Sequence, residues 1–131
     1  MNLKINLITC YFSVVSFLGV LINFNLLNLK LANLVLHYAF STTIPFFILQ
    51  IYSLTRFSEK LKNKNLKLFK KACIRPNGSI GNSINVASLF SEAILFSEIK
   101  DEVLLAKFRF TKRVVILSML SFIVLIFLIF I

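Results

Sequence analysis

His37 lies in an apolar stretch, and its side chain could carry a proton or bind a cofactor. It is the single histidine of the chain, and imidazole is the side chain whose ordinary pKa lies nearest neutrality. An ionisable group inside a membrane segment is a candidate proton carrier or haem ligand. A proton path normally needs carboxylates, which the surrounding apolar stretches lack, and a bis-histidine haem would need a histidine from a partner chain. We therefore interpret His37 as a helix-packing residue and keep cofactor binding as an alternative.

The remaining reactive side chains do not form a set that catalysis or metal binding would use. The sequence contains no Ser-His-acid combination, no metal-ligand spacing and no paired carboxylates. Its glycines at 78 and 81 are not followed by the Gly-Lys-Ser/Thr of a phosphate loop. Cys10 and Cys73 are expected at different levels of a membrane, too far apart for a disulfide. We predict that the protein is not an enzyme and has no catalytic residues, metal or cofactor.

The elements that hold these residues follow from the distribution of apolar side chains. Of the 131 residues, 58 % are hydrophobic and 15 % are charged, whereas a soluble domain is about half apolar and a quarter charged. Residues 5–29, 31–55 and 114–131 carry no charge, and about 20 apolar helical residues cross the ~30 Å of hydrocarbon in a bilayer. We predict an all-α integral membrane protein with three transmembrane helices: at about 4–25, at about 32–55, and at the end of a long helix over 102–131.

Two polar segments are expected to bound these helices. Four asparagines and Lys30 lie within residues 23–33, where they can satisfy backbone groups at a turn on the membrane surface. Residues 97–102 contain two N-cap candidates for the long helix, and no Pro or Gly follows them. The second span contains Pro45, which should open the helix locally, with Thr42 or Thr43 available for the freed backbone groups.

The charge distribution predicts the orientation of the chain. The formal net charge is +10, and residues 56–113 hold thirteen of the fifteen basic residues and all five acidic ones. Loops rich in Lys and Arg stay on the cytoplasmic side of a membrane. We therefore predict a cytoplasmic N-terminus, a cytoplasmic loop at 56–113 and a C-terminus outside. The domains are a transmembrane hairpin at 1–55, a basic cytoplasmic helical segment at 56–101 and the C-terminal helix at 102–131.

Residues 57–73 are expected to form a basic amphipathic helix that lies along the membrane surface. Phe57, Leu61, Leu68, Phe69, Ala72 and Cys73 share one face at 100° per residue, with lysines opposite. We expect anionic head groups to bind these lysines; a docking face for a protein partner or a regulated lipid switch is the alternative. Residues 84–99 are expected to form a second short helix that packs on the first or on the membrane. The predicted membrane-surface residues are Lys60, Lys64, Lys67, Lys70 and Lys71, with Lys107, Arg109, Lys112 and Arg113 at the lipid boundary.

Small polar residues recur along the predicted spans at helical spacing. In lipid, such residues let helices approach closely and exchange hydrogen bonds. We predict that they form the helix–helix interface: Asn6, Thr9, Ser13, Ser16 and Asn23 in the first span, Asn33, His37 and Ser41 in the second, and Ser118 and Ser121 in the third.

The order of segments over about 52–131 resembles that of small bacterial inner-membrane proteins similar to universal stress protein B. The matching features are the basic stretch LKNKNLKLFKKA at 61–72, the turn PNGSIGNS at 76–83, the apolar segment at 89–99, and Asp101 before a helix that enters a terminal span. The resemblance implies an N-terminal span, a cytoplasmic middle, a C-terminal span and an association with stress. The additional span before residue 31 departs from that pattern.

These features favour a small non-enzymatic membrane protein that acts through helix–helix assembly, as a homo-oligomer or as an accessory subunit of a membrane complex. Two alternatives remain: an immunity protein against a membrane-active toxin, and a small haem- or proton-handling subunit of a respiratory complex. The expected partners are anionic lipid and a protein partner or a second copy of the chain. Nucleic acid is not expected, because no nucleic-acid-binding fold accompanies the positive charge. We predict location in a bacterial inner membrane, with the mitochondrial inner membrane as the alternative.

Overall fold

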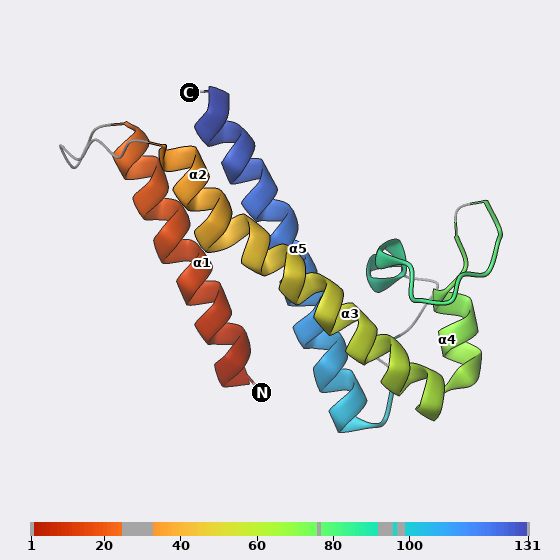
Figure 1. Ribbon diagram of the computed structural model, residues 1–131. Helices are drawn as coiled ribbons and strands as arrows, with labels where there is room; N and C mark the ends of the chain where they lie inside the picture. Colours follow the sequence, from red (N-terminus) through yellow and green to blue (C-terminus); the bar gives the residue numbers. More distant parts are fainter. Residues whose placement is uncertain (1, 25–32, 76, 92–95, 97–98, 131) are drawn as a thin grey trace. The chain divides into compact units, whose positions relative to one another are not determined.

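The structure, a computed structural model, describes residues 2–24, 33–75, 77–91, 96 and 99–130 (Figure 1). The described part is helical, without a β-strand; one isolated antiparallel bridge joins Ile74 and Ile80. The elements are α1 (Asn2–Asn23), α2 (Leu34–Tyr38), the π-helical turn η1 (Ala39–Thr43), α3 (Ile44–Lys64), α4 (Leu66–Ala72), the 3-10 helix η2 (Val86–Phe90) and α5 (Glu102–Phe130).

Three helical runs are long and apolar enough to cross a membrane. They cover Leu3–Asn23, Leu34–Lys64 and Glu102–Phe130, with 21, 31 and 29 residues. The helical class and the three candidate spans are thus confirmed. The predicted turn over 23–33 is described only at its ends: α1 ends at Asn23, and Asn33 precedes α2 with a positive φ of 61°.

The helix that contains the second span continues beyond the predicted end at Thr55 and stops at Lys64. Asn65 then leaves helical geometry, and its side-chain oxygen accepts a hydrogen bond from the backbone N–H of Leu68 at 3.0 Å. This is an N-cap, so the predicted single helix over 57–73 is divided into the end of α3 and the separate helix α4.

The predicted helix over 84–99 is wrong in its backbone geometry. Only Val86–Phe90 is helical among the described residues in its first half, and it is a 3-10 turn capped by the side chain of Asn85, which accepts from Ala87 N at 3.1 Å. Ser91 is extended and ends the turn. Residues 92–95, 97 and 98 lie outside the described residues.

The start of α5 has the predicted form. A carboxylate oxygen of Asp101 accepts a hydrogen bond from the backbone N–H of Leu104 at 2.8 Å. Such a bond satisfies one of the free N–H groups of a first helical turn. Of the two N-cap candidates, Asp101 is therefore the one that begins α5; Ser97 lies outside the described residues.

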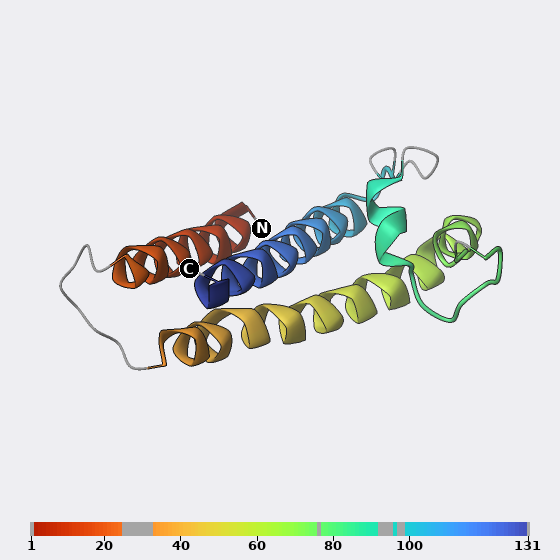
Figure 2. The same ribbon diagram turned by 90° about the horizontal axis from the view of Figure 1, so that it is seen from above.

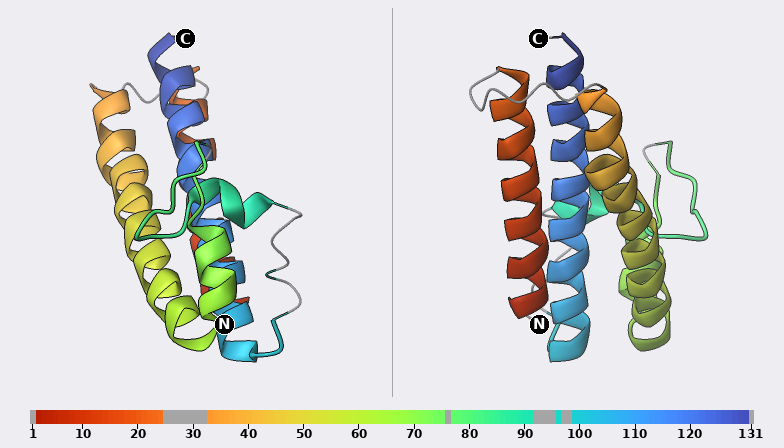
Figure 3. Two further views of the ribbon diagram at one scale, coloured as in Figure 1. Left: turned by 90° about the vertical axis from the view of Figure 1, so that its right-hand side faces the viewer. Right: turned by 60° about the vertical axis from the view of Figure 1, so that its left-hand side comes forward.

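The chain divides into two compact units. The apolar unit comprises Met1–Leu49 and Ile116–Ile131, and the basic unit comprises Gln50–Val115. In the apolar unit, α1, the run from α2 into α3 and the end of α5 lie alongside one another (Figure 3). Phe12, Phe46 and Leu117 form the buried centre of this unit.

The basic unit has a separate hydrophobic core. It is built from α3, α4, η2 and the part of α5 up to Val115, which Figure 2 shows from above. The buried members are Phe57, Leu61, Phe69, Ala72, Cys73, Ile84, Leu89, Phe96, Leu104, Phe108 and Val115. This core contains the apolar face that the sequence predicted for 57–73 and the apolar positions Leu89 and Phe96 of the following segment.

Candidate functional site

The inner face of α1 is formed by side chains three and four positions apart. Phe12, Ser16 and Gly19 are all buried, and this spacing places them on one face of the helix. The ring of Phe12 meets that of Phe46 edge to face, with centroids 5.8 Å apart. A Cβ atom at Gly19 would lie 3.5 Å from the Tyr38 ring. Gly19 therefore faces Tyr38 of α2 at a separation where a methyl group would make ordinary van der Waals contact.

Two tyrosine hydroxyls connect α1 with the second helical run. The hydroxyls of Ser16 and Tyr38 are 2.9 Å apart and both side chains are buried. Tyr11 donates a hydrogen bond to the backbone carbonyl of Ser41 at 2.6 Å. In an α-helix, that carbonyl would accept from residue 45, but Pro45 has no N–H. The local opening predicted before Pro45 is η1, and the hydroxyl of Tyr11, rather than Thr42 or Thr43, serves the freed carbonyl.

Two serines of α5 are completely buried in the apolar unit. Ser121 donates to the carbonyl oxygen of Ser118 at 2.7 Å, within its own helix. The hydroxyls of Ser118 and of the buried Thr43 have no hydrogen-bond partner among the described residues. Small polar side chains inside a helix bundle permit close packing, and both serines occupy such positions here.

The predicted interface residues divide into three groups. Ser16, Ser118 and Ser121 are buried, and Thr9 and Asn23 are half-buried. The hydroxyl of Thr9 donates to Ile5 O, 2.8 Å away in the same helix. The side chains of the other members are exposed: Asn6, Ser13, Asn33, His37 and Ser41. Ser41 still takes part in a helix contact, because its backbone carbonyl accepts from Tyr11.

His37 lies in the last turn of α2 with its side chain exposed. In the described part of the chain, no three His, Cys, Asp or Glu residues gather closely enough to hold a metal ion. A metal ion held by His37 and two further residues of these types would therefore need ligands from outside the described residues.

α1 is the least buried of the three candidate spans. Only 17 % of the apolar window of α1 is buried, against 33 % for that of α5. Asn6, Cys10 and Ser13 are exposed and lie four and three positions apart, on one side of the helix. We call these three residues the outer stripe. An apolar hollow of about 530 Å³ adjoins it, lined by Leu7, Ile8, Cys10, Tyr11, Val14 and Val15.

Aromatic rings organise the core of the basic unit. Phe57, Phe96 and Phe108 form a three-ring cluster with centroid separations of 5.6, 6.0 and 5.0 Å. The ammonium group of Lys112 lies 5.2 Å from the ring centre of Phe90 and 5.8 Å from that of Phe108. These are cation–π distances, so Lys112 covers the cluster with its charge on the outside.

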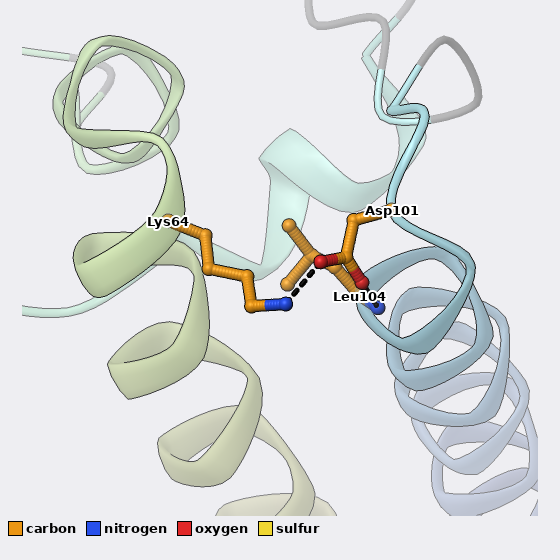
Figure 4. A network of polar contacts seen from close by, with 3 residues as sticks. All are labelled: Lys64, Asp101 and Leu104. Atoms are coloured by element: carbon orange, nitrogen blue, oxygen red, sulfur yellow. Dashed lines mark hydrogen bonds and ion pairs between the residues drawn. The ribbon is translucent and has the colours of Figure 1, made fainter.

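An ion pair joins the end of α3 to the start of α5 within the basic unit. The ammonium group of Lys64 donates to Asp101 Oδ2, while Asp101 Oδ1 caps α5 (Figure 4). The lysine, followed by the backbone N–H of Leu104, holds the pKa of the Asp101 carboxyl below its ordinary value. A single carboxylate thus links two helices that are distant in sequence.

The predicted membrane-surface residues are placed on the outside of the basic unit. Lys64, Lys67, Lys70, Lys71, Arg109 and Arg113 are exposed, and Lys60, Lys107 and Lys112 are half-buried. The apolar face opposite the lysines is not free to enter a membrane, because Phe57, Leu61, Ala72 and Cys73 are buried in the protein core. The predicted mode of membrane contact, through that apolar face, is therefore wrong.

Sequence reasoning missed several of the polar residues that connect helices within each unit. In the basic unit, the hydroxyl of Thr111 donates to the backbone carbonyl of Ser53 at 3.3 Å, and both residues are buried. In the apolar unit, Tyr11 and Tyr38 provide such contacts. Tyr38 and Pro45 lie seven positions apart, on either side of Thr42 and Thr43, and this spacing is visible in the sequence. It does not identify Tyr11 as the residue that bonds to Ser41.

No protein-family model, curated protein or solved structure matches this chain.

Proposed function

We propose that this chain is a non-enzymatic integral membrane protein that acts by assembly, as a homo-oligomer or as an accessory subunit of a membrane complex. In this proposal the three apolar helical runs insert into a bilayer, the basic unit lies in the cytoplasm and the C-terminus lies outside. Large apolar side chains exposed on all three helices, among them Leu7, Phe40 and Ile123, support insertion.

The outer stripe of α1 is the observation that carries the assembly. Asn6 and Ser13 keep polar groups exposed on a helix that the bilayer would surround. In lipid, an amide or hydroxyl is stabilised by a hydrogen bond to another helix, and small residues let that helix come close. The adjoining hollow offers an apolar surface for the same contact. We propose that a helix of a second copy or of a partner subunit packs there.

Mass measurement of the protein purified in a mild detergent tests this proposal. We expect an oligomer or a stoichiometric complex, and we expect Ser13→Leu to shift it toward the monomer because the larger side chain prevents close approach. Leu18→Phe is the matched control, since Leu18 is also exposed on α1 but lies about 140° around the helix from Ser13 and does not line the hollow. A strictly monomeric wild-type protein without a co-purifying partner would contradict the proposal.

A further inference from the structure

A short hairpin follows α4 and exposes two large apolar side chains. Ile74 and Ile80 face each other in the antiparallel bridge, and their exposed fractions are 47 % and 67 %. Directly opposed residues of such a pair lie on the same side of it. The hairpin therefore presents an apolar spot on the surface of an otherwise basic unit.

Hydrogen bonds hold this hairpin in place. Arg75 N donates to Ser79 O at 2.8 Å, and Gly81 N donates to Cys73 O at 2.9 Å. Asn77 Oδ1 accepts from both the backbone N–H and the hydroxyl of Ser79. The left-handed backbone at Gly78, with a φ of 78°, suits a residue without a side chain. The exposure of the two isoleucines is thus part of a defined structure.

The surroundings of the hairpin carry one sign of charge. Between Glu59 and Glu92 the sequence contains seven basic residues and no acidic one. Three of the basic residues, Lys70, Lys71 and Arg75, are exposed next to the hairpin. Apolar side chains beside Lys and Arg match the two layers of an anionic membrane surface, in which head groups carry the charge and acyl chains begin just below.

The chain reverses direction between α3 and α4, within the basic unit. α4 runs back along the last turns of α3, because Phe69, Ala72 and Cys73 pack with Phe57 and Leu61. Figures 1 and 3 show the hairpin continuing from the end of α4, away from the last turn of α3.

We propose that Ile74 and Ile80 insert into the interfacial layer of an anionic membrane, with Lys70, Lys71 and Arg75 on the lipid head groups. This contact differs from the amphipathic-helix anchor that the sequence predicted, because the apolar face of that segment is used by the core. The inference rests on the proposed insertion of the three helices, and its test separates the two.

Fluorescent labels at single cysteines provide the test. The full-length chain with Cys10→Ser and Cys73→Ala receives an environment-sensitive label at Ile80→Cys, Asn63→Cys or Ile123→Cys, and is reconstituted in phosphatidylcholine vesicles with or without phosphatidylglycerol. Lipids that carry a quencher at a shallow or a deep position report the depth of each label. The same labels in a chain that keeps the buried Cys73 control for the Cys73→Ala change.

With phosphatidylglycerol, we expect shallow quenching of the Ile80 label to be several-fold stronger than that of the Asn63 label, which lies on the exposed end of α3. Lys70→Gln, Lys71→Gln and Arg75→Gln together should reduce it to the Asn63 level, as should omission of phosphatidylglycerol. A quenched Ile123 label with an unquenched Ile80 label would overturn the hairpin contact and leave the proposed insertion intact. Quenching at Ile80 that ignores lipid charge would overturn the assignment to anionic lipid. An unquenched Ile123 label would overturn both proposals.

Discussion

The hydroxyl of Tyr11 and the missing amide hydrogen of Pro45 belong to one arrangement. The π-helical turn η1 lies just before Pro45, at the kind of position where a helix opens because a hydrogen bond is lost. Tyr11 on α1 fills the position of the lost donor at Ser41 O. The hydrogen bond between the two helices thus depends on the loss of a helical hydrogen bond at Pro45.

Removal of the Tyr11 hydroxyl should therefore cost more when Pro45 is present. We expect Tyr11→Phe to lower the free energy of unfolding by about 0.6–2 kcal/mol, the range of hydrogen bonds between membrane helices. In a Pro45→Ala background the cost should shrink, because residue 45 then supplies an N–H for Ser41 O. Unfolding of the four proteins in mixed micelles gives the coupling energy, and equal costs of Tyr11→Phe in both backgrounds would contradict the arrangement.

Individual buried residues could be predicted from the sequence only where a helical pattern carried the information. Ser118 and Ser121 lie three positions apart in an otherwise apolar run, and both are buried. In the sequence, Tyr11 and Tyr38 look like ordinary aromatic residues of apolar spans. Their hydrogen bonds depend on which residues of another helix lie opposite, and the periodicity of one helix does not contain that information.

At the scale of elements, Asp101 connects the start of α5 to the end of α3. Because hydrogen bonds from Lys64 and from Leu104 N lower the pKa of Asp101, its ionised form is favoured in the folded state. The resulting stabilisation is complete above the ordinary carboxyl pKa of about 3.9 and is lost as the pH falls through the lowered value. Acid should therefore loosen the junction of α3 and α5.

Hydrogen exchange of the amides in the first turn of α5 measures this effect. For the wild type we expect protection, corrected for intrinsic exchange, to fall as the pH drops below about 4. Asp101→Asn keeps an N-cap but cannot ionise, so its protection should be lower and independent of pH in this range. Lys64→Gln should weaken the dependence, since the backbone bond to Leu104 remains. The same pH dependence in Asp101→Asn as in the wild type would assign it to other carboxylates.

The apolar positions of the elements were easier to predict than the backbone that holds them. Leu89 and Phe96 are buried, although the segment that holds Leu89 is a 3-10 turn that ends at the extended residue Ser91. Burial is determined by side-chain hydrophobicity, while the choice between helical and extended backbone in so short a segment depends on tertiary contacts. The break at Asn65 did have a local signal in the sequence, because Asn is one of the residues preferred at the N-cap of a helix.

For the whole molecule, the separation of charge and apolar surface into two units is the main feature. The apolar unit contains only Lys4 and Lys30 as charged residues, and all other charges lie in the basic unit. This distribution can be read from the sequence, because it depends on which residue types occur in each part of the chain. The proposed partner of the outer stripe of α1 cannot be read from the sequence in this way, because it would belong to a different surface.

Cys73 is a poor reporter of orientation, although its position in the predicted cytoplasmic loop would suggest it as one. Its side chain is fully buried, and burial raises the pKa of its thiol above the ordinary value. The thiolate is the form that attacks thiol reagents, so a slow reaction of Cys73 would reflect packing on either side of a membrane. Orientation needs an exposed position such as Asn63.

Cysteine labelling at two new positions therefore tests the proposed topology. In a chain with Cys10→Ser and Cys73→Ala, Asn63→Cys should react with a membrane-impermeant maleimide only after the cells are permeabilised. Lys30→Cys, in the turn predicted outside, should react in intact cells. The physical reason is the concentration of thirteen basic residues in the basic unit, which retains that unit on the cytoplasmic side. Reaction of Asn63→Cys alone in intact cells would invert the orientation, and reaction of both would contradict a membrane crossing between residues 30 and 63.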